Sequence, residues 1–343
     1  MYGYKDPVII ITDGDIKRWE ATHGHYTYLF VNIAKGNSCE DLRLSHNLFS
    51  SLPDSFGKLQ SLRYLDLSHN RITELPETFG ELRELRELQL DGNGLTEIPQ
   101  SFRYLQLLDS LWLAENQFSV FPELVGHLPC LRLAVFDKNQ LTELPETFGN
   151  LSPVEVLSLT GNRLSSLPES FTNLAKLTDL SLDDNQLTQL PESFGKLTSL
   201  VRLSMNHNQL IELPASLGEL TNLEILAINH NRLTELPASI GNLGDLEVLS
   251  VTHNHLTTLP LSIGNLGRLR YLSLTGNQLT ELPATMEALT NLKSVFLEDD
   301  HPLTMPDSLA VCKERSLRMI SRKANNRLLS FNQRRFSHFN LTK

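Results

Sequence analysis

The chain has 343 residues, of which 40% are apolar and 7% aromatic, a composition typical of folded globular proteins that excludes a disordered chain. No apolar stretch is long enough to span a bilayer. The formal net charge of −10 is uneven, because residues 301–343 hold nine Lys or Arg against two Asp or Glu, a balance of +7, which leaves −17 on residues 1–300. The two parts are therefore interpreted separately.

The N-terminal segment, residues 1–38, lacks the repeat that fills most of the chain, and we interpret it as a cap with one strand near Val8–Ile11 and another near Tyr26–Ile33. The apolar run at Val8–Ile11 lies between two aspartates and is too short for a secretory signal.

Three cysteines, Cys39, Cys130 and Cys312, lie far apart and lack the paired spacing of a disulfide framework or a zinc site. Reduced thiols and a cytoplasmic location are the simplest expectation, with signal-independent secretion as the alternative.

A 23-residue period runs through residues 39–306 without an insertion or deletion. Asparagine marks one position of each copy: Asn47, Asn70, Asn93, Asn116, Asn139, Asn162, Asn185, Asn208, Asn231, Asn254 and Asn277, with Asp300 in the twelfth place. Proline marks another: Pro53, Pro76, Pro99, Pro122, Pro145, Pro168, Pro191, Pro214, Pro237, Pro260, Pro283 and Pro306. Twelve copies in register predict a solenoid.

Each copy combines a short strand with a helical turn. In Leu269–Leu279, LRYLSLTGNQL, apolar residues alternate around Leu272 and Leu274, which is the period of a strand with one buried face. After the proline, Phe194, Leu197 and Leu200 lie three apart, which predicts a single helical or 3-10 turn over the core.

The asparagines stand where the chain turns out of each strand. A carboxamide carries two donors and an acceptor, so it can bond backbone groups in its own turn and in the neighbouring one. We expect the eleven asparagines to form a buried ladder. Asp300 lacks the NH₂ donors, which predicts that stacking ends there.

The strand pattern with its LPxxFGxL or LPxxIGxL segment resembles the leucine-rich-repeat family, and specifically its 23-residue intracellular class of scribble-type, Ras-suppressor-type and many bacterial proteins. The resemblance covers roughly residues 39–309. It implies an α/β solenoid shaped as a horseshoe of about 12 repeats, with a parallel concave sheet, short helical or 3-10 turns on the convex side, and terminal caps. It also implies that the concave face holds proteins.

The C-terminal segment is predicted to hold a capping helix over residues 307–331 and a basic tail over residues 332–343. Leu317, Ile320, Ala324 and Leu328 have the spacing of one helix face. The opposite face is basic, with Arg315, Arg318, Arg322, Lys323 and Arg327. A solvated cap is the simplest interpretation, and residues 313–335 are also suited to an acidic partner, an anionic membrane or nucleic acid. No nucleic acid is expected on the solenoid.

Partner-binding residues are expected on the concave face, where the side chains two, four and six positions before each asparagine point away from the core. Aromatic and acidic residues gather there in the N-terminal third, an apolar strip with acids follows, and the pattern favours a protein partner with basic and apolar surface. The predicted contacts are Tyr64, Asp66, Glu87, Asp91, Trp112, Glu115, Val135, Asp137, Asp179, Asp183, Arg202 and Tyr271.

Histidine repeats at one position in three successive copies, as His207, His230 and His253, with His255 just beyond. An ordinary rim ladder is the simplest interpretation. The alternatives are a pH-sensitive contact and a metal site.

The chain contains none of GxxxxGK[ST], GxGxxG, HExxH or GxSxG, so we expect a non-catalytic protein-binding scaffold with no cofactor and no small-molecule substrate. The alternative is an effector or regulatory subunit that controls a bound enzyme or small GTPase, with the basic tail as a second contact.

Overall fold

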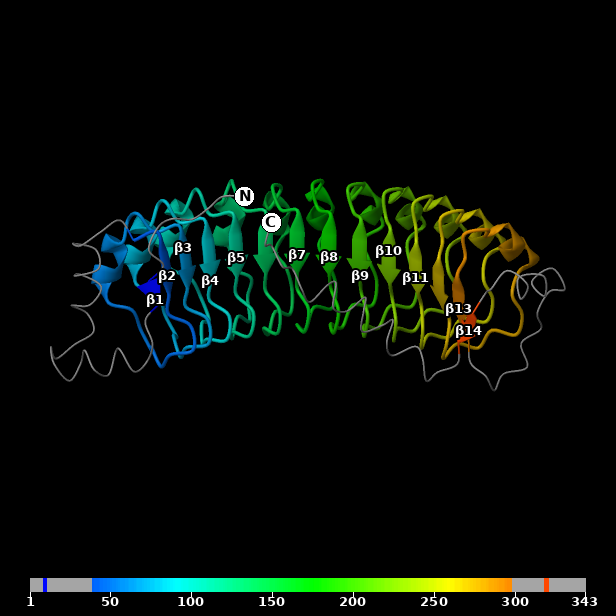
Figure 1. The fold of residues 1–343 in the computed structure, drawn as a ribbon, viewed down its shortest axis with the longest axis horizontal. Coiled ribbons are helices and arrows are strands. Elements are labelled where there is room, and N and C mark those ends of the chain that lie inside the picture. The colour runs from blue at the N-terminus through cyan, green and yellow to red at the C-terminus, as the bar shows by residue number, and fades with distance from the viewer. Residues whose placement is uncertain (1–8, 11–38, 298–317, 321–343) are drawn as a thin grey trace. The chain divides into compact units, whose positions relative to one another are not determined.

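The computed structural model describes residues 9–10, 39–297 and 318–320. The chain divides into two compact units, residues 1–163 and 164–343, each of which is described by itself. Both units repeat one element pair, a three-residue parallel strand and a 3-10 turn, and Figure 1 shows successive strands side by side within each unit. The solenoid of short strands and 3-10 turns is confirmed.

The strands of the first unit are β1 (Ile9–Ile10), β2 (Asp41–Arg43), β3 (Tyr64–Asp66), β4 (Glu87–Gln89), β5 (Ser110–Trp112), β6 (Leu133–Val135) and β7 (Val156–Ser158). Those of the second unit are β8 (Asp179–Ser181), β9 (Arg202–Ser204), β10 (Ile225–Ala227), β11 (Val248–Ser250), β12 (Tyr271–Ser273), β13 (Ser294–Phe296) and β14 (Arg318–Ile320). From β2 to β7 and from β8 to β13, each residue pairs with the residue 23 positions on, as Leu65 does with Leu88.

The 3-10 turns of the first unit are η1 (Asp54–Lys58), η2 (Glu77–Glu81), η3 (Gln100–Tyr104), η4 (Glu123–His127) and η5 (Glu146–Asn150). Those of the second unit are η6 (Glu169–Asn173), η7 (Phe194–Lys196), η8 (Ala215–Glu219), η9 (Ala238–Asn242), η10 (Leu261–Asn265) and η11 (Ala284–Ala288).

The repeating proline explains why a 3-10 turn begins where it does. The ring fixes φ near the value that a turn requires, and in η2 the carbonyl of Pro76 accepts the N–H of Phe79 at 2.9 Å, the i to i+3 bond of a 3-10 turn. Phe79 then points into the core with no exposed surface. Its ring centroid lies 6.2 Å from that of Phe56 and 6.3 Å from that of Phe102, so the turns stack a column of phenylalanines.

The asparagine ladder has the predicted bonding. At Asn139 the side-chain Oδ1 accepts the N–H of Phe118 in the preceding repeat at 3.1 Å. Nδ2 donates to the carbonyl of Leu113 in that repeat at 2.9 Å and to the carbonyl of Phe136 in its own repeat at 3.1 Å. Each asparagine of this kind therefore ties its own turn to the one before it.

Both ends of the sheet extend past the repeats. The strand predicted near Val8–Ile11 is confirmed as β1, which pairs in parallel with β2. The strand predicted at Tyr26–Ile33 lies outside the described residues. At the other end β14 pairs in parallel with β13, so the sheet does not end at Asp300.

The prediction of a helix over residues 307–331 is wrong at Arg318–Ile320, which form β14, and the other residues of that range lie outside the described part. The physical reason is that the open edge of β13 offers a row of backbone donors and acceptors. Backbone pairing with these groups stabilises Arg318–Ile320 as a strand. The three-and-four spacing of apolar residues does not take this pairing into account.

Candidate functional site

The outward side chains of the first unit's sheet gather aromatic, acidic and apolar groups. We name this set the acidic-aromatic face: Tyr64, Asp66, Glu87, Asp91, Trp112, Glu115, Val135 and Asp137. Parallel register places Tyr64 beside Glu87, and Gln89 between Asp66 and Trp112. The alternate strand residues, such as Leu88 and Leu111, are fully buried below them, because successive strand side chains point to opposite faces.

Trp112 is the large apolar group at the centre of this face. It is half-buried and lies between Gln89 on β4 and Val135 on β6. Among the described residues the indole N–H has no hydrogen-bond acceptor. A partner could therefore gain both apolar contact with the ring and a hydrogen bond from the indole N–H.

Tyr64 is held by a cation that the sequence analysis did not single out. The guanidinium carbon of Arg43 lies 5.0 Å from the centroid of the Tyr64 ring, and the same guanidinium makes two 3.1 Å bonds to the carboxylate of Asp41. Burial, and then the charge of Asp66, raise the pKa of Tyr64 to about 12. The phenol is thus a fixed, protonated hydrogen-bond donor at neutral pH.

The acids of this face fall into two groups. Asp66 is only 9% exposed, and its Oδ1 accepts the N–H of Ser68 at 2.9 Å and the hydroxyl of Ser68 at 2.6 Å. Asp137 likewise accepts the N–H of Thr160 at 2.9 Å. Both carboxylates accept hydrogen bonds from groups that follow the ends of strands. Asp66 is therefore less accessible to a partner than its outward position predicts.

Glu87 and Glu115 are the exposed acids. Glu115 pairs with Lys138 at 2.6 Å, and this hydrogen bond lowers the pKa of Glu115. Glu87 forms no ion pair within the described part of the chain, and burial followed by the charges of Asp109 and Asp41 raises its pKa. Glu87 is therefore the exposed acid of this face that a partner's cation would stabilise.

Asp91 lies among other acids, and its titration has a predicted effect on stability. Burial, and then the charges of Asp137, Asp66 and Glu115, raise its pKa to about 7, although Oδ1 accepts the N–H of Ala114 at 2.7 Å. A raised carboxyl pKa means that the folded state holds the proton more tightly than the unfolded state does. Stability is thus lost as pH rises from the unfolded pKa, about 3.9, through about 7.

We expect Asp91→Asn to raise the free energy of unfolding at pH 8 by about 2 kcal/mol, since the buried charge is removed and the amide oxygen can still accept the N–H. The gain should vanish near pH 4. Urea unfolding at the two pH values measures it. Asp54→Asn at an exposed position is the control, expected to change stability equally at both. Equal stability of Asp91→Asn and the unaltered protein at pH 8 would show that the Asp91 carboxylate is well solvated.

In the second unit the predicted acidic contact residues already bond other groups of the fold. Asp179 is 4% exposed and forms an ion pair with Arg202. Asp183 accepts the hydroxyl of Ser204 and the N–H of Asn206, both at 2.6 Å, while burial raises its pKa. Tyr271 on β12 is half-buried. Partner binding by these residues stays a prediction.

The three histidines form a stacked column. The ring centroids of His207 and His230 are 4.2 Å apart, and those of His230 and His253 are 4.3 Å apart, with nearly parallel planes. Burial, and then the neighbouring rings, lower the pKa of His230. His255, beyond the column, is exposed. In the described ranges no three or more His, Cys, Asp or Glu residues are grouped so that they could hold a metal ion.

The position just before each ladder asparagine has a backbone requirement that sequence reasoning missed. It adopts a left-handed φ of 53° at His207, 54° at His230 and 71° at Gly276. Glycine at three of these positions was the available signal. The histidines therefore stack at a turn that the backbone fixes.

Comparison with protein families decides what kind of protein this is. A model described as "Leucine-rich repeat region" matches residues 122–232. A model described as "Leucine rich repeat" matches residues 38–95 and 221–279. The chain belongs to the leucine-rich-repeat family. No curated protein matched it.

Solved leucine-rich-repeat structures share the fold. One protein of Leptospira interrogans is 29% identical, with 84% of this chain and 85% of that chain covered and a TM-score of 0.64. An internalin of Listeria monocytogenes is 22% identical, with coverage of 83% and 80% and a TM-score of 0.71. A chain of the Drosophila Toll–Spatzle complex is 23% identical, with 81% of this chain and 43% of that chain covered and a TM-score of 0.64.

No helix in the described ranges combines the length and the apolar character needed to cross a membrane.

Proposed function

We propose that this leucine-rich-repeat chain is a non-catalytic scaffold that binds a protein on the acidic-aromatic face of its first unit. The observation that carries the proposal is Trp112, a half-buried indole on an open sheet whose N–H has no acceptor among the described residues. Tryptophan and tyrosine are enriched among the residues that contribute most to binding at protein interfaces. The Toll structure, which is a complex with Spatzle, supports a protein partner for this fold in general.

The charges of the face favour a partner with basic and apolar surface. Glu87 is exposed and lacks an ion pair in the described part of the chain, and Val135 adds apolar area beside Trp112. A partner's lysine or arginine near Glu87 would lower the pKa of that carboxyl and offset the repulsion from Asp109 and Asp41. An apolar side chain beside it would cover Trp112 and Val135.

Affinity capture from the native host tests this proposal. The intact protein and a Tyr64→Ala, Trp112→Ala double variant are used as baits, and captured proteins are identified by mass spectrometry. We expect a partner that the intact protein retains and the double variant loses, because the two aromatic anchors supply most of the contact energy.

Tyr104→Ala is the matched control, since Tyr104 is an aromatic residue of the same unit that lies on η3, outside the acidic-aromatic face. It should capture the partner as well as the intact protein does. Capture of the same proteins by the double variant would place the contact elsewhere on the chain.

A further inference from the structure

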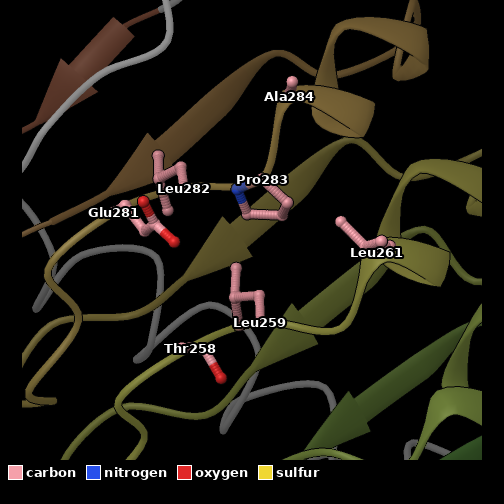
Figure 2. Close-up of a pocket in the computed structure, with 7 residues that line it drawn as sticks. All are labelled: Thr258, Leu259, Leu261, Glu281, Leu282, Pro283 and Ala284. Carbon is pink, nitrogen blue, oxygen red and sulfur yellow. The ribbon is translucent and has the colours of Figure 1, made fainter.

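An apolar cavity lies on the turn side of the second unit, away from the strands. It has a volume of about 440 Å³ and is lined by Leu259, Leu261, Leu282 and Pro283, with Thr258 and Glu281 as its polar groups. Figure 2 shows the side chains of Leu259, Leu261 and Pro283 around this space. The volume falls within the range of pockets that bind small ligands or single side chains.

The repeat itself shows that this cavity is unusual. In each copy an apolar residue precedes the repeating proline, and this pair has one residue directly before it and one directly after it. The first of these two positions lies four residues after the asparagine position, and the second is the residue after the proline. In eleven of the twelve copies at least one of the two is Glu or Asp, as in Glu74 with Glu77, or Glu235 with Ala238. The copy with Thr258 and Leu261 has neither. Along the repeats these positions therefore form an acidic series, and it is interrupted at the copy that holds Thr258 and Leu261.

Leu261 is a strongly exposed apolar side chain at this cavity. It is 71% exposed, the largest fraction among the exposed large apolar side chains of the described residues. It begins η10 directly after Pro260, and its counterpart in the next copy is Ala284, so nothing bulky shields it. Leu261 thus adds exposed apolar area to the apolar lining of the cavity.

Carboxylates stand on both sides of this apolar site. Glu281 lines the cavity itself, and Glu235 holds the same position two copies earlier, with Thr258 between them. Both glutamates are exposed. A partner segment with cationic side chains next to one inserted apolar side chain would complement these two charges.

We propose that this cavity is a second docking site, which takes one bulky apolar side chain of a peptide segment whose neighbouring residues are Lys or Arg. The apolar side chain contacts Leu259, Leu261 and Pro283, and the cations pair with Glu281 and Glu235. The site is formed by the segments that lead into η10 and η11 of the second unit, so it shares no residue with the acidic-aromatic face of the first unit. Its partner segment need not belong to the protein bound there.

The test uses the full chain with a defined probe, the acetylated peptide Gly-Lys-Phe-Lys-Gly. Methyl signals of Leu259, Leu261 and Leu282 are followed by NMR as peptide is added. We expect saturable shifts at these methyl groups. A peptide with Glu in place of both lysines, and one with Ala in place of Phe, should each bind at least tenfold more weakly.

Leu261→Glu restores the acidic pattern of the other copies and should weaken binding at least tenfold. Ala215→Glu places the same carboxylate two copies earlier, away from Glu235 and the cavity, and should leave binding unchanged, as should the Tyr64→Ala, Trp112→Ala double variant. The thermal unfolding of Leu261→Glu and of Ala215→Glu should match that of the intact protein, because Leu261 and Ala215 are exposed. Three results would overturn the proposal: equal binding by Leu261→Glu, equal binding of the Glu peptide, or shifts that follow protein concentration alone, which would indicate a second copy of the chain.

Discussion

Replacing one ladder asparagine, Asn139→Ala, is expected to lower the free energy of unfolding by about 4 kcal/mol. The substitution leaves the N–H of Phe118 and the carbonyls of Leu113 and Phe136 without the partner that they have in the folded chain. Each unsatisfied buried backbone group costs about 1 to 3 kcal/mol. The same side chain couples adjacent repeats, so the loss also weakens the interface on which solenoid stability depends. Urea unfolding followed by circular dichroism measures the change.

Asn150→Ala is the matched control, because Asn150 is an exposed asparagine at the end of η5 in the same unit. Its effect should stay within about 0.5 kcal/mol. If Asn139→Ala were as mild as Asn150→Ala, water or a relaxed backbone would be satisfying the exposed groups, and the ladder would not stabilise the solenoid.

Removing one ring of the phenylalanine column, Phe79→Ala, is expected to cost about 3 to 5 kcal/mol, the range for a buried phenylalanine. Phe79 has no exposed surface, and its neighbours Phe56 and Phe102 belong to other repeats whose spacing is fixed by the strands. The backbone therefore cannot collapse into the cavity. The free energy of urea unfolding is again the measurement.

Tyr104→Ala is the control for this column, since Tyr104 is an aromatic residue of η3 that is 46% exposed. It contacts the cations of Arg83 and Arg103 at the surface, so its loss should cost less than about 1 kcal/mol. A cost for Phe79→Ala no larger than that for Tyr104→Ala would mean that neighbouring side chains fill the space.

The repeat made the fold predictable from the sequence, because its period carries both the strand alternation and the turn. Leu272 and Phe194 are buried where the pattern places them, and the asparagines make the bonds that their chemistry allows. β14 was not predictable in this way. Its strand at Arg318–Ile320 depends on pairing with the edge of β13, a contact distant in sequence that apolar spacing does not encode.

The candidate site was predictable in place but not in detail. Alternation correctly put Asp66 and Asp179 on the outward side of their strands, yet both are buried. The reason is that Ser68, two residues on in the same repeat, bonds Asp66, while Arg202 reaches Asp179 from the adjacent strand, about 5 Å away. The roles of Arg43 and Lys138 likewise depend on contacts between repeats, which a single-strand pattern does not contain.

Trp112 is proposed to anchor a protein partner on the first unit. The most direct test of this proposal is the dissociation constant of the captured partner, measured by isothermal titration calorimetry with the intact protein and with Trp112→Ala. We expect at least fivefold weaker binding by Trp112→Ala, which corresponds to a loss of about 1 kcal/mol or more. An unchanged dissociation constant would contradict it and exclude Trp112 from the interface.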